Sequence, residues 1–344
     1  MVNIGGGGHS VEVADVRKSY GAVTALHPAH VRITAGQFVG VLGASGCGKS
    51  TLLRCLAGLE EPESGRISIG ERVVFDAADA VAVRPRDRHL GMVFQDLALW
   101  PHLSVFENVA FPLRARRERD GLRARVEAAL ERVRLTGYAH RYPQELSGGQ
   151  QQRVAFARAI VGDPRLLLMD EPLSALDSGL RAALRTELAQ LTRELGLTTV
   201  YVTHDQEEAM AMSDRILVMR EGRIRQDSPP EELYRNPADP GVAELVGRFN
   251  HLPSDISPAA LAGVRPERVG ITDGAGHGGI RLNGRIAASA YVGGRYELSC
   301  RVEGTEHPWT VYAAETQPVG STVSLHVASD DLLAFDSPSA QRPA

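Results

Sequence analysis

The feature that most constrains this chain is a glycine-rich octapeptide, Gly43-Ala-Ser-Gly-Cys-Gly-Lys-Ser50. It fits the pattern G-x-x-x-x-G-K-[ST] at every fixed position and follows an apolar run, 38–42, that predicts a buried strand. Glycines let such a loop curl so that successive N–H groups face a phosphate, and the helix that follows adds the positive end of its dipole. We therefore expect a nucleotide site on an α/β fold.

Two polar residues of this loop have specific expected roles in binding ATP. Lys49 can reach the β- and γ-phosphates, and the hydroxyl of Ser50 can hold Mg²⁺. A glycine-rich turn without a ligand is the alternative, which the Lys-Ser pair and the preceding strand make the weaker hypothesis. The residues expected to contact the nucleotide here are Gly43, Ala44, Ser45, Gly46, Cys47, Gly48, Lys49, Ser50 and Thr51.

Length and composition exclude several classes of protein. With 344 residues, 43% of them hydrophobic, the chain should form two soluble domains. A formal net charge of −4 gives no sign of a nucleic-acid binder. The three cysteines have no metal-ligand spacing and are expected to be reduced thiols. No apolar stretch is long enough to span a bilayer, and residues 1–10 lack a signal pattern and are expected to be a flexible tail. We therefore expect an intracellular protein.

The pattern of apolar residues predicts an α/β domain over residues 11–240. Residues from about 11 to 35 alternate between apolar and polar, which predicts antiparallel strands that lead into the phosphate loop. The runs 91–94, 166–169 and 199–202 predict buried parallel strands. Residues from about 101 to 150 lack strand patterns, so we expect an inserted helical subdomain there.

The pattern of residues changes after this domain. Prolines punctuate a short helical stretch, and residues 241–254 are expected to be a linker. From 255 to 338, strand patterns and glycine turns dominate, including the run Asp273-Gly-Ala-Gly-His-Gly-Gly279. This spacing predicts an all-β domain with an OB-like barrel.

Two carboxylates at the end of an apolar run point to metal-assisted hydrolysis. The run Leu166-Leu-Leu-Met-Asp170-Glu171 predicts a strand whose end presents Asp170 toward Mg²⁺ and Glu171 toward an attacking water. An ordinary acidic turn is the alternative. The phosphate loop upstream favours the catalytic interpretation.

The segment Leu146-Ser147-Gly148-Gly149-Gln150 predicts a second anion-binding surface. A serine and two glycines open an apolar helical pattern that runs to Ile160, so backbone N–H groups should be exposed at a helix N-terminus. One chain has no need of two phosphate clamps around one ATP. In a pair of chains, however, the 146–150 segment of each chain could bind the nucleotide that the phosphate loop of the other chain holds. The expected contacts are Ser147, Gly148, Gly149 and Gln150.

Taken together, these motifs resemble the ATPases of ATP-binding cassette (ABC) transporters. The order of the phosphate loop, Gln95, 146–150, 166–171, Ser174-Ala-Leu-Asp177 and His204 is that of the family, over about residues 11–225. The resemblance implies a P-loop ABC ATPase domain with a parallel-sheet core, an antiparallel β subdomain and a helical subdomain. It also implies a head-to-tail homodimer that holds ATP between the phosphate loop of one subunit and the 146–150 segment of the other.

The resemblance assigns roles to single residues as well. Tyr20 is similar to the aromatic residue that stacks on adenine, although a strand tyrosine in a core is the alternative. Gln95 resembles the glutamine that senses Mg²⁺ and water beside the membrane subunit, and Asp177 the residue that links the two sites. His204 resembles the histidine that contacts the γ-phosphate and orients Glu171, although a strand-end histidine is ordinarily structural. The implied catalytic residues are Glu171, His204, Lys49 and Gln95, and the implied Mg²⁺ ligands are Ser50, Gln95 and Asp170.

The C-terminal half resembles one subgroup of these ATPases. Gly263-Val-Arg-Pro-Glu267, and the segments 88–96 and 101–105, are similar to bacterial importer ATPases with a transport-associated OB domain. Trp100 departs from the usual Phe or Tyr near the expected contact with the membrane subunit. The implied partners are membrane permease subunits and, indirectly, an external solute-binding protein. The implied location is the cytoplasmic face of the inner membrane.

The resemblance leaves the cargo open, with ferric iron or a polyamine expected first and a sugar less favoured. The alternative function is a soluble ABC-type ATPase that acts on ribosomes or DNA. Such relatives carry two cassettes or a long coiled coil, and this sequence has one cassette and no sustained heptads. The C-terminal module has few aromatic residues for stacking on bases, so we expect no nucleic-acid partner.

Overall fold

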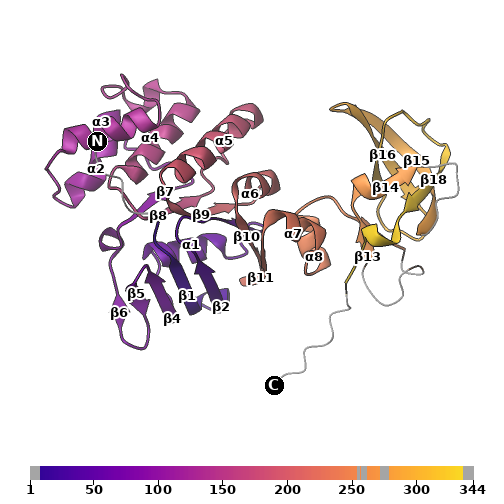
Figure 1. The fold of residues 1–344 in the computed structure, drawn as a ribbon, viewed down its shortest axis with the longest axis horizontal. Coiled ribbons are helices and arrows are strands. Elements are labelled where there is room, and N and C mark those ends of the chain that lie inside the picture. Colours follow the sequence, from indigo (N-terminus) through magenta and orange to yellow (C-terminus); the bar gives the residue numbers. More distant parts are fainter. Residues whose placement is uncertain (1–7, 254–255, 257–261, 272–278, 336–344) are drawn as a thin grey trace. The chain divides into compact units, whose positions relative to one another are not determined.

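The computed structural model describes residues 8–253, 256, 262–271 and 279–335. The chain forms two compact units, Met1–Pro230 and Glu231–Ala344 (Figure 1), and each is described by itself. None of the helices in the described ranges combines the length and the apolar character that crossing a bilayer requires. The expected α/β cassette followed by an all-β domain is confirmed.

The first unit consists of two sheets and several helices (Figure 1). Its strands are β1 (Val11–Tyr20), β2 (Val23–Ile33), β3 (Phe38–Leu42), β4 (Ser64–Ile69), β5 (Arg72–Asp76), β6 (Val81–Ala82), β7 (Leu90–Val93), β8 (Leu166–Asp170), β9 (Thr198–Thr203), β10 (Arg215–Arg220) and β11 (Arg223–Ser228). Its helices are α1 (Lys49–Ala57), α2 (Val105–Ala115), α3 (Leu122–Arg132), α4 (Gly148–Ile160), α5 (Ser178–Glu194) and α6 (Gln206–Met212).

The central sheet has the strand order β11-β10-β3-β9-β8-β7, and β10, β3, β9, β8 and β7 run parallel. Alternate residues of its strands enter two different hydrophobic cores. On β8, Leu167 and Met169 pack with the helical side, whereas Leu166 and Leu168 pack with α1 and the antiparallel sheet. Both faces are buried, which explains why these strands appear in the sequence as continuous apolar runs.

The other two parts of the first unit lie at opposite ends of it (Figure 1). An antiparallel sheet with the order β2-β1-β4-β5-β6 contains the strands expected over 11–35. The expected helical subdomain consists of α2, α3 and the start of α4. Helix α2 begins with a capping box between Ser104 and Glu107, in which each side chain bonds the backbone N–H of the other.

The second unit is a small all-β fold preceded by two short helices. Its elements are α7 (Pro230–Arg235), α8 (Pro240–Leu245), β12 (Asn250–His251), β13 (Ala262–Val264), β14 (Val269–Ile271), β15 (Ile280–Val292), β16 (Arg295–Val302), β17 (Trp309–Ala313), β18 (Thr322–Val327) and β19 (Leu332–Ala334). Strands β14-β18-β15-β16-β17 form one sheet whose two edge strands approach each other, which gives a nearly closed barrel.

A buried arginine ties the short helices to this barrel. The guanidinium of Arg265 donates to the carbonyl oxygens of Ala243 (2.7 Å), Gly247 (3.0 Å) and Tyr234 (3.2 Å). It also lies over the Tyr234 ring, 4.2 Å from the centroid. The division between the units comes after Pro230, and the expected linker, 241–254, includes β12 and all of α8 except its first residue.

Part of the predicted tail is ordered. The N–H of Gly8 donates to Gly196 O (2.8 Å), and that of His9 donates to Arg165 O (3.2 Å). Gly70 N–H donates to Ser10 O (2.8 Å). The expectation of a flexible segment is thus wrong for residues 8–10, because backbone hydrogen bonds fix them beside the sheet. Residues 1–7 and most of the 273–279 glycine run lie outside the described residues.

Candidate functional site

The phosphate loop connects β3 to α1, as the sequence predicts. Gly48 is the residue before α1 and has φ 103°, a conformation that favours glycine. At Gly43, an added Cβ would lie 2.3 Å from the carbonyl oxygen of Met219, so a larger residue would push against the neighbouring backbone. These two glycines set the path of the loop for steric reasons, and its N–H groups precede the N-terminus of α1.

The Lys49 side chain is buried and folds back over the loop. Its ammonium donates to the carbonyl oxygens of Gly43 (2.7 Å) and Ala44 (3.0 Å). Its Nζ also lies 3.9 Å from Oε1 of Glu171, which follows β8. The Lys49 ammonium thus contacts the phosphate loop and lies near the carboxylate of Glu171 at the end of the neighbouring strand.

Two hard oxygen donors meet beside this lysine. The hydroxyl of Ser50 donates to Oδ1 of Asp170 at 2.9 Å. Asp170 is buried; burial raises the pKa of its carboxyl, and the hydrogen bond from Ser50 acts in the opposite direction. No group of three His, Cys, Asp or Glu side chains that could hold a metal occurs in the described ranges. A hydroxyl and a carboxylate nevertheless suit Mg²⁺, which takes few protein ligands and fills the rest of its shell with water and phosphate oxygens.

Three side chains from three different segments converge on the carboxylate of Glu171. His204 Nδ1 lies 2.9 Å from Oε2, and Gln95 Nε2 donates to the same oxygen at 3.5 Å. Lys49 Nζ faces Oε1, as described above. Gln95, Glu171 and His204 follow the carboxyl ends of β7, β8 and β9, and Lys49 is the first residue of α1, after the loop that follows β3. These strands are neighbours in the order β3-β9-β8-β7, so the topology places the ends side by side.

The backbone at Glu171 is held in an unusual conformation. Its φ is 44°, which is rare for a residue with a side chain. Its N–H donates to Val202 O (3.0 Å), and its carbonyl oxygen accepts from both the N–H (3.2 Å) and the hydroxyl (2.9 Å) of Ser174. Such conformations persist where the surroundings fix them, and they cluster at functional sites.

Tyr20 lies at the end of β1 with 45% of its surface exposed. The alternative of a tyrosine packed in a core therefore does not hold for this residue. The ammonium of Lys18 lies 5.3 Å from the ring centroid. Burial, followed by the negative charge of Glu60, raises the pKa of the Tyr20 hydroxyl. The side chain is therefore accessible to a base.

The 146–150 segment caps α4. Ser147 is the N-cap; its Oγ accepts from the N–H of Gln150 (3.4 Å), and Gln150 Oε1 accepts from the N–H of Ser147 (3.0 Å). Ser147 and Gly148 are exposed, and the capping box engages the N–H groups of Ser147 and Gln150 but not those of Gly148 and Gly149, so the helix end can still receive an anion. Within the part of the chain that the structure describes, no hydrogen bond or ion pair joins this segment to the phosphate loop. The two predicted phosphate-binding surfaces are thus not brought together in one chain.

Asp177 caps the next helix. Its Oδ1 accepts from the N–H of Leu180 at 3.0 Å, at the start of α5. The side chain is exposed, and the structure gives it no contact with the carboxylate of Glu171. It therefore has a local structural role in the single chain.

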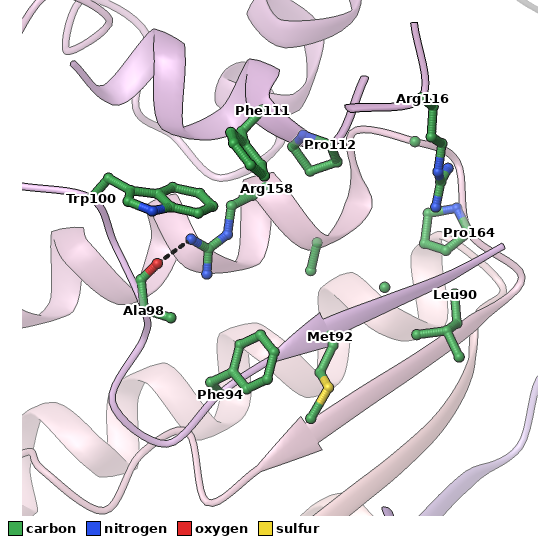
Figure 2. A pocket seen from close by; sticks show the side chains of 13 residues that line it. Leu90, Met92, Phe94, Ala98, Trp100, Phe111, Pro112, Arg116, Arg158 and Pro164 are labelled. Carbon is green, nitrogen blue, oxygen red and sulfur yellow. Dashed lines mark hydrogen bonds between the residues drawn. The ribbon is translucent and has the colours of Figure 1, made fainter. Parts of the chain in front are cut away.

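A pocket of about 280 Å³ lies next to the segment that follows Gln95 (Figure 2). Figure 2 shows the rings of Trp100 and Phe111 on one side of it and Phe94 and Met92 across from them. The Trp100 and Phe111 ring centroids are 4.0 Å apart. Gly91 and Pro164 also line the pocket, which is mainly apolar.

Arg158 was not predicted from the sequence and shapes this pocket. It is buried on α4, and its guanidinium donates to the carbonyl oxygens of Ala98 (2.5 Å) and Leu97 (2.6 Å). Both of these residues have positive φ, 44° and 58°. Burial lowers the pKa of Arg158. Its position four residues after the buried Val154, on the apolar face of the helix, is a sequence signal that could have identified it.

Comparison with known proteins places this chain in a family. The family model described as ABC transporter matches residues 26–174, and that described as TOBE domain matches residues 262–335. An Fe(3+) ions import ATP-binding protein of Agrobacterium fabrum is 43% identical over 320 residues, which cover 86% of this chain and 88% of that protein. This chain belongs to the ABC transporter family.

Other relatives and solved structures of ABC cassettes agree with this assignment. A trehalose/maltose import ATP-binding protein of Thermococcus litoralis is 50% identical over 69% of this chain and 64% of that protein. A spermidine/putrescine import ATP-binding protein of Haemophilus influenzae is 48% identical over 70% of this chain and 63% of that protein. The dimeric structure of MJ0796, a bacterial ABC transporter cassette, is 32% identical with a TM-score of 0.55, and the match covers 64% of this chain and 98% of that one.

The family assignment confirms the expected activity. This ABC ATPase is an ATP-binding and ATP-hydrolysing subunit of an importer, and the alternative of a ribosome- or DNA-directed ATPase is not supported. The C-terminal TOBE match agrees with the expected transport-associated barrel.

Proposed function

We propose that this ABC ATPase hydrolyses Mg²⁺-bound ATP as a head-to-tail homodimer and thereby drives solute import through membrane permease subunits. The observation that carries the proposal is the convergence of Lys49, Gln95 and His204 on the carboxylate of Glu171, beside the phosphate loop. This group holds a carboxylate oriented at the place where the γ-phosphate of a loop-bound nucleotide would end.

The residues of the site divide the chemical work. Glu171 accepts the proton of the attacking water, and His204 fixes the orientation of its carboxylate through the 2.9 Å contact. Lys49 exchanges its loop carbonyls for the β- and γ-phosphates and balances charge in the transition state. Ser50, Asp170 and Gln95 would hold the Mg²⁺ ion, which would neutralise phosphate charge. Tyr20 would stack on the adenine through its exposed ring.

The second phosphate-binding surface serves the nucleotide of the partner subunit. The exposed N-terminus of α4 has no link to the phosphate loop of its own chain, yet its N–H groups and Ser147 are arranged to bind an anion. A head-to-tail pair would place this helix end on the γ-phosphate held by the other chain, next to Asp177. ATP then binds the closed pair better than the open one and shifts the population toward it.

The pocket beside Trp100 is the proposed docking site for a cytoplasmic segment of the permease. It is apolar, and the segment that forms its wall continues directly from Gln95, which contacts Glu171. Arg158 holds the backbone of this segment at Leu97 and Ala98, so a side chain that enters the pocket would press on the segment that carries Gln95. Docking there would place the chain at the cytoplasmic face of the inner membrane.

Ferric iron is the proposed cargo, with a polyamine as the second choice. The match to the Fe(3+) import protein extends over 320 residues and 86% of this chain, so it reaches into the barrel as well as the cassette. The polyamine and sugar relatives match over 241 and 238 residues. Deletion of this chain should lower uptake of radioactive iron while uptake of spermidine continues. The opposite pattern would reassign the cargo and leave the ATPase mechanism intact.

Complementation between two inactive chains tests the composite site. Gly148→Asp places a carboxylate where the partner's phosphate should bind, and an acidic residue at the first helical position is compatible with the helix dipole. Glu171→Gln removes the base. Each variant alone should be inactive, whereas a mixture should regain up to half of the wild-type rate per mixed dimer, because one site then has both intact halves.

The mixing experiment has a clear contrary result. If the mixture stays inactive while each variant binds ATP with wild-type affinity and melts at the wild-type temperature, the two surfaces do not act on one nucleotide. A Gly148→Ala chain is the matched control, since it adds a side chain without the charge and should retain most of the activity.

A further inference from the structure

One buried side chain joins the two catalytic elements that serve different nucleotides. Gln152 lies in the second turn of α4, whose N-terminus serves the partner's nucleotide in the proposed dimer. Its Nε2 donates to the carbonyl oxygen of Pro172 at 2.6 Å. Pro172 directly follows Glu171, the base for the chain's own nucleotide. Gln152 is 6% exposed, so water competes little for this hydrogen bond.

The turn that receives this hydrogen bond has little freedom to move. The carbonyl oxygen of Glu171 is fixed by Ser174, and the φ of Glu171 is 44°. A shift of the Pro172 carbonyl would therefore rotate the backbone that aims the Glu171 carboxylate. The same hydrogen bond fixes how far α4 lies from this turn, so its two ends constrain two different active sites.

The tip of α4 also rests on the segment that continues from the turn. A Cβ added at Gly148 would lie 3.3 Å from Leu176 Cδ2, and one added at Gly149 would lie 3.2 Å from Leu180 Cδ1. These are close approaches between the 146–150 segment and residues 172–180. A displacement of either part is therefore passed to the other by packing, and Gln152 is the hydrogen bond within this contact.

The amide oxygen of Gln152 indicates that packing alone does not account for a glutamine at this position. Its Oε1 is one of four buried side-chain atoms without a hydrogen-bond partner among the described residues. Buried polar atoms are almost always paired. The amide cannot be turned around, because its oxygen would then face the carbonyl oxygen of Pro172. A methionine would fill a similar volume with no unpaired oxygen, so the donor to Pro172 is what an amide adds.

We propose that Gln152 is a positioning residue that couples the two active sites of the dimer. It ties the helix that binds the partner's phosphate to the turn that aims the chain's own catalytic carboxylate. Binding of the partner's ATP at the tip of α4 thereby stabilises the active position of Glu171 in the same chain. The inference rests on the proposed composite site and adds to it a route within each chain.

Mixtures of two inactive chains test separately whether Gln152 supports the tip of α4 and whether it supports the turn that carries Glu171. The reference pair is Gly148→Asp mixed with Glu171→Gln. Its intact site uses Glu171 of the Gly148→Asp chain, whose α4 tip cannot bind the partner's phosphate, so coupling predicts that this pair is active but turns over more slowly than half of the wild-type rate. In the trans pair, Gln152→Met is added to the Glu171→Gln chain, so the only intact site takes its carboxylate from the other chain. In the cis pair, Gln152→Met is added to the Gly148→Asp chain, so the intact site takes its carboxylate from the altered chain.

Coupling predicts that both pairs lose about tenfold in the rate of ATP hydrolysis relative to the reference pair, because catalysis is sensitive to small misplacements. Loss in only one pair would mean that Gln152 supports one element alone and would overturn the coupling. Unchanged rates in both pairs would do the same. An inactive reference pair would refute the composite site itself, which the mixing experiment detects separately.

Thr192→Val is the matched control for the loss of a buried polar group. Thr192 is 1% exposed, and its hydroxyl donates to Leu188 O at 3.0 Å within α5. The same substitution added to either chain should leave the rate of the pair within twofold of the reference. ATP affinity and melting temperature are measured for every chain, so that a folding defect is distinguished from a positioning defect.

A second variant tests the hydrogen bond itself. In Gln152→Glu the ionised carboxylate cannot donate to Pro172, whereas the protonated acid can. The rate of this variant divided by that of the wild type should rise at least threefold as the pH falls from 8 to 6, since burial raises the pKa of a carboxyl. For Gln152→Met the ratio should stay flat. A flat ratio for both variants would overturn the role of the donor.

Discussion

Glu171→Gln is the substitution whose outcome follows most directly from the geometry. The amide keeps the shape of the carboxylate, and its oxygen can still face His204 and Gln95. Only the basicity and the charge are lost. Removal of a general base lowers turnover by about 10²–10⁴-fold, which corresponds to about 2.7–5.4 kcal/mol of barrier.

The same substitution should not weaken ATP binding. In the free chain, Lys49 Nζ lies 3.9 Å from Glu171 Oε1, and both side chains are largely buried. Opposite charges about 4 Å apart attract by about 4 kcal/mol at an effective dielectric constant of 20, before desolvation is counted. The phosphates must compete with this attraction for the ammonium. In the variant that competitor is absent, so ATP affinity should be equal or higher.

The assay combines phosphate release with the mass of the ATP-bound species. We expect a kcat that is reduced at least a hundredfold, together with a stable dimer in size-exclusion chromatography when ATP and Mg²⁺ are present. Glu207→Gln is the matched control, since Glu207 is a glutamate on α6 whose side chain is 84% exposed and contacts Arg185 rather than the site. It should behave like the wild type. A Glu171→Gln chain that turns over within threefold of the wild type would refute the assigned base.

Three further predictions concern other parts of the cassette. Burial raises the pKa of the Cys47 thiol, so alkylation should be slow at pH 7, faster at higher pH and blocked by ATP; labelling with undiminished ATP affinity would contradict the position of the loop. Arg158→Met should lower the free energy of unfolding of the first unit, measured with urea, by about 2–4 kcal/mol, because two buried carbonyl oxygens lose their hydrogen-bond donor. A decrease below about 0.5 kcal/mol would contradict the role of this arginine. Asp170→Asn should raise the melting temperature of the nucleotide-free chain at pH 7 and abolish stabilisation by ATP with Mg²⁺. Burial raises the folded-state pKa of the Asp170 carboxyl above its ordinary value of 3.8, so ionisation of this group destabilises the folded chain as the pH rises above that value. The stability that the Asn variant gains should therefore disappear below pH 3.8, and an equal gain at pH 3 would exclude this cause.

Much of the site was predictable because its residues stand next to strand ends. Gly43, Asp170, Glu171 and His204 each follow an apolar run, and the carboxyl ends of neighbouring parallel strands lie at one edge of a sheet. The motif spacings and the rule of alternating strands and helices were therefore enough to predict a shared site and the α/β cassette around it.

Residues that act through tertiary contacts were not predictable in this way. Arg158 and Gln152 lie within α4, and their partners are backbone carbonyls 60 and 20 positions away in the chain. A carbonyl oxygen has no residue identity, so no sequence pattern marks it as a partner. The ordered residues 8–10 were missed for the same reason, since backbone groups of distant segments hold them.

The amino-acid sequence by itself determined the local chemistry: a loop that can bind phosphate, carboxylates at a strand end, a capped helix with open N–H groups and an all-β second domain. Local steric and hydrogen-bonding preferences are sufficient for these features. The tertiary structure alone decided which side chains meet Glu171, how Arg158 shapes the pocket beside Trp100, and that α4 is tied to the turn after the catalytic carboxylate. Those contacts depend on the order of strands in the sheet and on the packing of helices against it, and these bring together residues that are far apart in the chain.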